Sequence, residues 1–349
     1  MIIDKNVILE MSLRKLNSIF FAAALVFAVV SCKKDKETGT SLPALNGTLK
    51  AEVPEFMTPG KKVTMKPYGI SHPEGGTIGY CWKVSPTMTK YDTADVFEFT
   101  PTDTLQTVSI ICYAFADNYS TSSASYSSTV VKGGLDGSLK GLGINKEDTK
   151  ITVDGTDYYY VRIGDVDWFR NNLASVSAGA PFRNSAVMSD VFGCFYSYEE
   201  ALTACPQGWR LPSEEDWLSL AKACGAPASL TKYDNIPGIV AKLMADATFN
   251  DIVLWEYWPA VGEITNSAKM AVVPAGYANL GDKRQDGKYP HAIFSGVYEY
   301  AAFWTSDTVA EEQDKAYYRY ILDDQPYVFA GKGDRLSFGA NVRCVRDAK

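Results

Sequence analysis

The chain holds few of the side chains from which catalytic and metal sites are commonly built. It has two histidines, His72 and His291, far apart in the sequence, and no Cys-x-x-Cys pair. A zinc site needs several nitrogen or sulfur ligands, and an activated serine or cysteine needs a base beside it. The sequence therefore predicts no catalytic residue, no metal and no cofactor. A glycan-acting enzyme is the weakest alternative, because no motif singles out a carboxylate pair among the 41 acidic residues.

Aromatic side chains are the best candidates for ligand binding. They gather in two segments of the C-terminal half, one beside Pro259 and one at residues 289–300. Exposed rings stack on sugar faces or anchor protein partners. The alternative is that these rings fill the core of a loop-rich domain. The candidates are Trp255, Tyr257, Trp258, Phe294, Tyr298 and Tyr300.

The composition indicates an acidic, β-rich protein. A chain of 349 residues has room for two or three domains. Aromatic residues make up 13%, with 21 tyrosines, which suggests β-rich domains whose surfaces can bind through aromatic side chains. The net charge is −7 and the basic residues are dispersed, so nucleic acid is not an expected partner.

The N-terminus has the features of a secretion signal. Arg14 and Lys15 precede an apolar run, Ile19–Val30, which is too short for a comfortable membrane span. The run leads into Val29–Cys32 (VVSC), which resembles the lipobox of bacterial lipoproteins. That resemblance implies that residues 1–32 are a lipoprotein signal peptide and that Cys32 is lipidated. An ordinary secretory signal is the alternative.

A lipid at Cys32 would anchor the protein in the cell envelope, and we expect the outer membrane. Residues 33–46 are predicted to be a tether. Their start, Lys33–Glu37 (KKDKE), partly resembles the surface-export signals of Bacteroidota lipoproteins, although those are usually more acidic. The periplasmic face and the outer surface both stay open.

The first predicted domain covers residues 47–131. Short strand-like runs such as Val96–Thr100 are separated there by proline and glycine turns, which favours a β-sandwich. The runs around Trp82 resemble PKD-like and bacterial Ig-like domains, and Trp82 is expected to be a core side chain. The glycine-rich residues 132–148 are predicted to be a linker.

The segment Cys205–Trp217 (CPQGWRLPSEEDW) predicts a helix start. Ser213 is a good N-cap, and the acidic residues that follow it favour the positive end of the helix dipole. One helical face collects apolar residues, and Gly225 is suited to the helix end. That face consists of Trp217, Leu220, Ala221 and Cys224.

An ordered series of motifs runs from residue 149 to residue 349. Besides the Cys205 segment it includes residues 151–173, 193–201, 273–276 (VPAG), 302–307 (AFWTSD) and 341–347 (NVRCVRD). The series resembles the Fibrobacter succinogenes major paralogous (FISUMP) domain. The resemblance implies an α+β, C-type-lectin-like fold. The whole chain is therefore expected to be multidomain, with an all-β sandwich followed by this α+β domain.

The same resemblance assigns structural roles to several residues. It implies a disulfide between Cys205 and Cys344, and it implies that Arg343 is a buried, paired arginine. It also implies a core formed by Trp168, Trp209, Trp217 and Trp304.

Six cysteines follow Cys32, an even number in an oxidising compartment. Grouping by domain favours two further disulfides besides the one that the resemblance implies. They are Cys81–Cys112 and Cys194–Cys224, the second beyond the family's usual pair. Buried free thiols are the alternative.

Calcium deserves a separate test, because many C-type lectins hold sugars through this ion. Two stretches, Trp304–Asp307 and Asp323–Pro326, carry carboxylates near the expected places. Neither supplies the full oxygen-ligand set that calcium needs, so solvated turn carboxylates are the favoured interpretation.

Three Asp-Thr-aliphatic triplets resemble the O-glycosylation site of Bacteroidota secreted proteins. Their threonines are Thr93, Thr104 and Thr308.

The predicted function is that of a non-enzymatic cell-envelope lipoprotein. Its C-terminal domain would present a lectin-like binding surface for a glycan or a cell-surface protein, as in carbohydrate binding or adhesion. The alternative is a structural or assembly accessory of a fimbrial or polysaccharide-uptake system.

Overall fold

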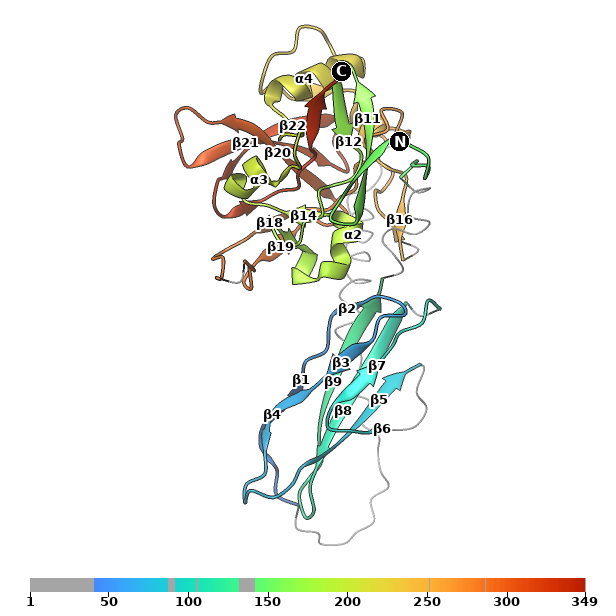
Figure 1. Cartoon of the computed structure of the whole chain (residues 1–349), viewed down its shortest axis with the longest axis vertical. Helices are drawn as coiled ribbons and strands as arrows, with labels where there is room; N and C mark the ends of the chain where they lie inside the picture. Colours follow the sequence, from blue (N-terminus) through green and yellow to red (C-terminus); the bar gives the residue numbers. More distant parts are fainter. Residues whose placement is uncertain are drawn as a thin grey trace, which may run out of the picture. The chain divides into compact units, whose positions relative to one another are not determined.

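The computed structural model describes residues 41–86, 92–104, 106–131, 142–250, 252–285 and 287–348. The chain divides into two compact units, Met1–Val130 and Val131–Lys349. Figure 1 shows that strands dominate both units, which confirms a multidomain, β-rich protein. The predicted signal peptide, Cys32 and much of the predicted tether and linker lie outside the described residues. Of the helices that are described, none is long and apolar enough to cross a membrane.

The N-terminal unit is built from strands alone among its described residues. A five-stranded sheet has the order β2-β9-β8-β5-β6, and two strand pairs, β1-β4 and β3-β7, accompany it. The strands are β1 (Asn46–Ala51), β2 (Phe56–Met57), β3 (Val63–Met65), β4 (Pro67–Ser71), β5 (Gly79–Ser85), β6 (Asp92–Thr93), β7 (Phe97–Phe99), β8 (Thr107–Phe115) and β9 (Ser122–Val130).

Trp82 lies at the centre of this unit's core and is 0% exposed. Its ring stacks on Phe97 with the centroids 5.5 Å apart, and its Nε1 donates to the carbonyl of Ala94 at 2.8 Å. An indole that is fully buried with its N–H paired is a packing element. The prediction that Trp82 is a core side chain is confirmed.

The predicted Cys81–Cys112 disulfide is wrong, because both cysteines are free. Across the β5–β8 ladder Cys112 stands opposite Trp82, whereas Cys81 stands opposite Tyr113. Paired residues share a face of a sheet and successive residues alternate. The Cys112 side chain therefore enters the core with Trp82, and the Cys81 side chain projects from the other face.

The C-terminal unit combines small antiparallel sheets with short helices. Two sheets have four strands, in the orders β10-β11-β12-β24 and β15-β22-β21-β20, and a third has the order β19-β18-β23. The strands are β10 (Lys150–Val153), β11 (Thr156–Ile163), β12 (Val166–Phe169), β13 (Ala180–Pro181), β14 (Cys194–Phe195), β15 (Ile236–Pro237), β16 (Thr248–Phe249), β17 (Ile252–Val253), β18 (Tyr277–Asn279), β19 (Ile293–Ser295), β20 (Tyr300–Thr308), β21 (Lys315–Leu322), β22 (Tyr327–Asp334), β23 (Phe338–Gly339) and β24 (Val345–Asp347).

The helical segments are short and lie mainly in the first half of this unit. They are η1 (Phe182–Asn184), η2 (Ala186–Met188), α2 (Ser189–Phe192), α3 (Tyr198–Ala204), α4 (Glu214–Ala223) and α5 (Val240–Leu243).

Helix α4 begins where the sequence predicts it. The Ser213 side chain accepts from the amide of Asp216, and the Asp216 carboxylate accepts from the amide of Ser213, so the capping box is complete. The helix ends at Ala223, and Gly225 follows with φ +90°, a conformation that glycine adopts without strain. The apolar face predicted from Trp217 to Cys224 packs on one core cluster, as expected.

The sheet of β20, β21 and β22 separates two hydrophobic clusters. Ala301 and Phe303 belong to the cluster that contains Trp168 and Trp217, whereas Ala302 and Trp304 belong to the cluster that contains Trp209. Because side chains alternate along a strand, a single β20 serves both clusters. The four tryptophans that were predicted to form the core do so.

The C-terminal unit contains the Cys205–Cys344 disulfide, with the Cα atoms 5.7 Å apart. The predicted Cys194–Cys224 disulfide is wrong, because both thiols are free. Cys194 lies in the cluster of Trp209, whereas Cys224 packs against the cluster of Trp168. The two side chains therefore belong to different parts of the core.

Arg343 is buried, as the resemblance implies, but its partners are neutral. Its Nε donates to Oδ1 of Asn172 at 2.6 Å, and its terminal nitrogens donate to backbone carbonyls, including that of Ala271 at 3.1 Å. Burial and the nearby charge of Arg170 lower the pKa of Arg343. The guanidinium thus ties the segment before β24 to residues 169–172, at and after the end of β12, and to residues 270–271.

Candidate functional site

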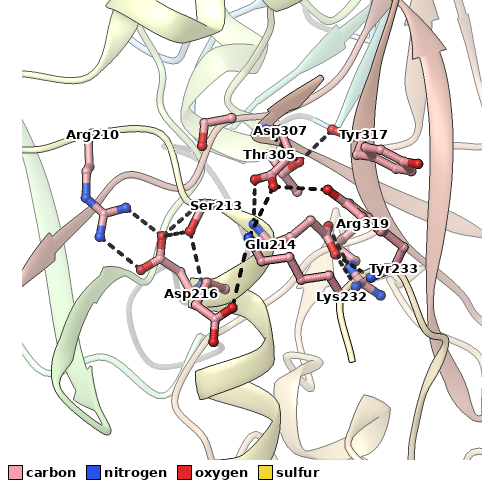
Figure 2. A network of polar contacts seen from close by, with 12 residues as sticks. Arg210, Ser213, Glu214, Asp216, Lys232, Tyr233, Thr305, Asp307, Tyr317 and Arg319 are labelled. Carbon is pink, nitrogen blue, oxygen red and sulfur yellow. Dashed lines mark hydrogen bonds and ion pairs between the residues drawn. The ribbon is translucent and has the colours of Figure 1, made fainter. Parts of the chain in front are cut away.

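Two parts of the C-terminal unit qualify as candidate sites: a polar network at the start of α4, and an aromatic face on the sheet that α4 supports. We call the first the polar frame. It consists of Arg210, Ser213, Glu214, Asp216, Lys232, Tyr233, Thr305, Asp307, Tyr317 and Arg319 (Figure 2).

The centre of the polar frame is an ion pair between Glu214 and Arg319, whose side chains are both 0% exposed. Arg319 donates through Nε to Oε1 of Glu214 at 2.9 Å, and a second bond runs from its Nη2 to Oε2. A third bond runs from its Nη1 to the carbonyl of Asp234 at 2.6 Å. The guanidinium fork therefore fastens β21 both to α4 and to the loop before β15.

Asp307 connects β20 to the same helix. Its Oδ2 accepts from the amide of Glu214 at 2.8 Å, and its Oδ1 accepts from the hydroxyl of Tyr233 at 3.3 Å (Figure 2). Tyr233 in turn stacks on Tyr317, with the ring centroids 3.9 Å apart. A carboxylate at a helix N-terminus is favoured by the helix dipole.

Asp216 completes the frame on the outer side. It accepts two bonds from Arg210, at 2.5 and 2.9 Å, and Arg210 also donates to Asp347 at 2.8 Å. Burial alone would raise the pKa of Asp216, but the bonds from Arg210 and Ser213 outweigh it and lower that pKa. Each carboxylate of the frame is thus engaged in holding elements together. The polar frame therefore joins α4 to β20, to β21 and to the loop before β15.

We call the second candidate the tyrosine surface. It consists of Tyr277, Tyr300, Tyr318, Tyr320, Tyr327, Phe329 and Phe338. Tyr327 is 40% exposed and the other six rings are half-buried. Figure 1 shows the three strands β20, β21 and β22 that carry most of these rings side by side.

Strand register explains why these rings share one face. Tyr320 stands opposite Ala302 on β20 and opposite Phe329 on β22. Tyr318 stands opposite Trp304 and Gly331. Residues that face each other across a ladder point to the same side, so the tyrosines of β21 line up with the rings of both neighbours.

The rings form one continuous row of contacts. The centroids of Phe329 and Tyr320, and those of Tyr320 and Tyr300, are 5.0 Å apart. Tyr277 lies 5.2 Å from Tyr300 and 5.7 Å from Phe338. Contacts of this kind stabilise beyond simple burial, which makes the surface rigid before any ligand arrives.

The hydroxyl groups of Tyr300 and Tyr318 remain protonated at neutral pH. Burial raises the pKa of both Tyr300 and Tyr318. Their hydroxyl oxygens lie 3.2 Å apart, and this contact raises the pKa of Tyr300 further while it partly offsets the rise for Tyr318. The surface therefore offers neutral donors and acceptors on an apolar background.

The two candidates are parts of one construction. Arg319 projects from β21 between Tyr318 and Tyr320, but toward the opposite side of the sheet, into the polar frame. The frame fixes β21 against α4, and β21 carries the centre of the tyrosine surface. Alternation along a single strand thus separates the supporting residues from the residues that can meet a ligand.

The structure divides the six aromatic residues predicted from the sequence. The prediction of Trp255 as a binding residue is wrong, because its side chain is 2% exposed and its Nε1 donates to the carbonyl of Val272 at 2.8 Å. Tyr257 is 70% exposed, and the half-buried Trp258 donates to Asp323 at 3.1 Å.

The other three lie in the second aromatic segment, and each is half-buried. Phe294 contacts Phe182 and Phe195, while Tyr298 packs edge-on against Phe192. Tyr300 alone belongs to the tyrosine surface. Sequence reasoning missed the remaining six rings, although alternation of Tyr318 with Tyr320 and of Tyr327 with Phe329 would have placed them on common faces.

The acidic stretches considered for calcium are also placed by the structure. Asp307 belongs to the polar frame, and Asp323 accepts from Trp258. Burial raises the pKa of Asp323 to about 6, helped by the negative charges of Asp324, Glu299 and Glu256. Within the described ranges no group of three or more potential ligands could hold a metal ion.

The threonines of the three glycosylation triplets stay predictions. Thr104 is exposed, with its hydroxyl 2.9 Å from that of Thr102, and Thr308 is exposed at the end of β20. Thr93 lies in β6, and its side chain is outside the described part of the structure.

Fold and site together define a β-rich protein of two units, in which a disulfide-closed domain presents an aromatic face. The chain belongs to the Fibrobacter succinogenes major domain family, whose model matches residues 161–346. A search of curated proteins found no relative of this chain.

Proposed function

We propose that this protein is a non-enzymatic, lipid-anchored protein of the cell envelope that binds a surface ligand, a glycan or an envelope protein, through the tyrosine surface. The observation that carries the proposal is the unbroken row of seven rings on β18, β20–β22 and β23. Contiguous apolar surface that remains accessible marks interaction sites, and tyrosine is enriched in them.

Support also comes from the polar frame. Binding is stronger when the binding residues are held in place beforehand, because less entropy is lost on association. The tyrosine surface meets this condition, since the Glu214–Arg319 ion pair fixes the strand between its rings. The frame's carboxylates are engaged in this way, which favours a binding role over a catalytic one.

The test is a binding screen on two probes, a glycan array and a displayed library of short random peptides, with the full-length protein purified in detergent. Tyr320→Ser and Phe329→Ser should each weaken any binding found by about tenfold, the usual size of a hot-spot effect. Tyr68→Ser is the matched control, because Tyr68 is 51% exposed but lies in the N-terminal unit.

Binding should survive a calcium chelator. Equal loss of binding in all three variants, or none in any, would reject the tyrosine surface as the site. Loss on chelation would instead restore the calcium interpretation of the acidic stretches. A single acidic residue whose replacement abolishes glycan cleavage would support the enzyme alternative.

A further inference from the structure

The arrangement of rings on the tyrosine surface restricts the ligand. Tyr300 and Tyr320 are nearly parallel, with an interplanar angle of 9° at 5.0 Å, and Tyr320 and Phe329 make 17° at the same distance. Parallel rings this close overlap face to face. Tyr320 therefore has both of its faces covered, and Tyr300 and Phe329 each have one face covered. A sugar stacks on an open ring face, so these rings suit it poorly.

The outer edge of β22 lies beside these rings and is only partly paired. In the sheet order β15-β22-β21-β20, the short β15 pairs with Tyr327 and Val328 alone. The next outward amide, that of Ala330, donates to the side chain of Asn235 at 3.2 Å. Among the described residues, no strand pairs with Gly331–Asp334 on this side.

Successive residues of a strand direct their backbone N–H and C=O groups to alternate edges, so the known hydrogen bonds show which groups of β22 point outward. The carbonyl of Pro326 and the amide of Ala330 both bond on the outer side, whereas the amide of Arg335 bonds back toward the β21 side, to Asp314. The register between β21 and β22 is regular from Val328 to Asp334. The backbone N–H groups of Lys332 and Asp334 therefore point outward, and such groups are a template for another strand.

The side chains at this edge leave it accessible. On the ring-bearing face, Gly331 and Gly333 add no side chain, and a Cβ at Gly331 would lie 2.5 Å from the Tyr318 ring. On the other face, Lys332 pairs with Glu312 at 2.7 Å. Lysine often guards edge strands against pairing. Here its charge is already engaged away from the edge.

We propose that β22 binds an extended segment of a partner protein as an added strand. The segment's backbone pairs with Lys332 and Asp334, and its alternate apolar side chains lie against Phe329 and Tyr318. Gly331–Asp334 spans about 13 Å at 3.3 Å per residue, enough for a segment of about four residues. The inference rests on the proposed function and names its ligand class as polypeptide.

The decisive pair of variants is at Lys332. Lys332→Pro removes the outward N–H, and it breaks no bond to β21 because proline is tolerated where the N–H faces away from the sheet. Both Lys332→Pro and Lys332→Ala lose the Lys332–Glu312 ion pair, but Lys332→Ala keeps the backbone N–H. The probe is a peptide selected from the random library on the full-length protein. Lys332→Pro should weaken its binding about tenfold or more, and Lys332→Ala should stay within about twofold.

Amide hydrogen exchange on the unmodified protein is a second measurement that needs no variant. The selected peptide should slow exchange at Lys332 and Asp334, whose amides point outward. Equal affinity of the two Lys332 variants, or unchanged exchange at both amides, would overturn the added-strand inference.

The outcomes separate this inference from the proposed function. Glycan binding that is lost in Tyr320→Ser but kept in Lys332→Pro would retain the tyrosine surface as the site and reject the added strand. Peptide binding that is unchanged in both Tyr320→Ser and Lys332→Pro would reject the tyrosine surface as the site and the added strand as well. If the Lys332→Pro variant unfolds at the same temperature as the unmodified protein, any loss of binding is local to the edge of β22.

Discussion

At the scale of single residues, the buried Glu214–Arg319 ion pair should matter strongly for the stability of the C-terminal unit. Both side chains are 0% exposed, so water does not solvate either charge, and each charge is stabilised by the other. Arg319→Met should lower the free energy of unfolding of the C-terminal unit by about 3–5 kcal/mol, because it leaves a buried carboxylate unpaired. Urea unfolding followed by tryptophan fluorescence reports on this unit, since six of the seven tryptophans lie in it.

Two controls make that result specific. The double variant Glu214→Leu with Arg319→Met should recover much of the loss, because neither charge is then stranded. Lys150→Met breaks a partly exposed ion pair of the same unit, with both side chains 37% exposed, and it should lower the free energy of unfolding far less. A loss in Arg319→Met no larger than that of Lys150→Met would contradict the importance of the buried pair.

Asp323 predicts a pH dependence. Its pKa is raised to about 6 by burial and by three neighbouring acids, so the folded protein binds this proton more tightly than the unfolded chain. The protonated carboxyl therefore adds stability below about pH 4, and this contribution is lost as the pH rises through about 6. Asp323→Asn keeps an acceptor for Trp258 but cannot ionise.

The variant should be more stable than the unmodified protein at pH 7, by about 1 kcal/mol because water screens a partly exposed group. Its stability should also change less between pH 4 and pH 7. The measurement is the free energy of unfolding across that range for both proteins. Parallel curves would show that Asp323 does not titrate in this window.

At the scale of elements, the Cys205–Cys344 disulfide joins the segment before α4 to the segment before β24. The two cysteines are 139 residues apart in the sequence. In the chain-entropy model, a loop this long stabilises by about 4–5 kcal/mol through the unfolded state. Cys205→Ser should therefore lower the melting temperature of the C-terminal unit sharply, as should a reductant acting on the unmodified protein.

Cys224→Ser serves as the matched control for that variant. Cys224 is a free, partly buried thiol at the end of α4, so its replacement should change the melting temperature only slightly. Similar effects of the two substitutions would mean that the disulfide contributes little beyond packing.

The elements also show how far the sequence alone leads. The start of α4 was predictable because Ser213 and Asp216 satisfy each other's amides within one turn. The pairing of Cys81 with Cys112 was not, because it depends on which residues of β5 and β8 stand opposite, and Cys112 stands opposite Trp82. Capping is local, whereas register is set by contacts between distant segments.

The candidate site shows the same division. Tyr257 is 70% exposed, but Trp255 two residues earlier is buried and donates to the carbonyl of Val272. The tyrosine surface escaped prediction because its rings come from five strands, and only their pairing brings Tyr320 beside both Tyr300 and Phe329. Alternation gives each strand a face, but the sequence does not show which faces adjoin.

At the scale of the whole molecule, the proposed function needs the chain to stay in the envelope, and the lipid at Cys32 is the proposed anchor. A single acyl chain holds a protein only reversibly, so stable anchoring requires more than one chain or a second membrane contact. Cys32→Ala removes the thioether site while leaving the apolar run Ile19–Val30 for export. The variant should move from the membrane fraction to the soluble envelope fraction.

Fractionation followed by immunoblotting measures this directly, with metabolic labelling by a fatty acid as the companion experiment. Cys81→Ala is the matched control, because it removes a free thiol from the N-terminal unit and should leave the protein in the membrane fraction. A Cys32→Ala variant that remains membrane-bound, with the label still incorporated, would refute the lipoprotein proposal. Release of the variant with its peptide or glycan binding intact would separate anchoring, at Cys32, from recognition, at the tyrosine surface.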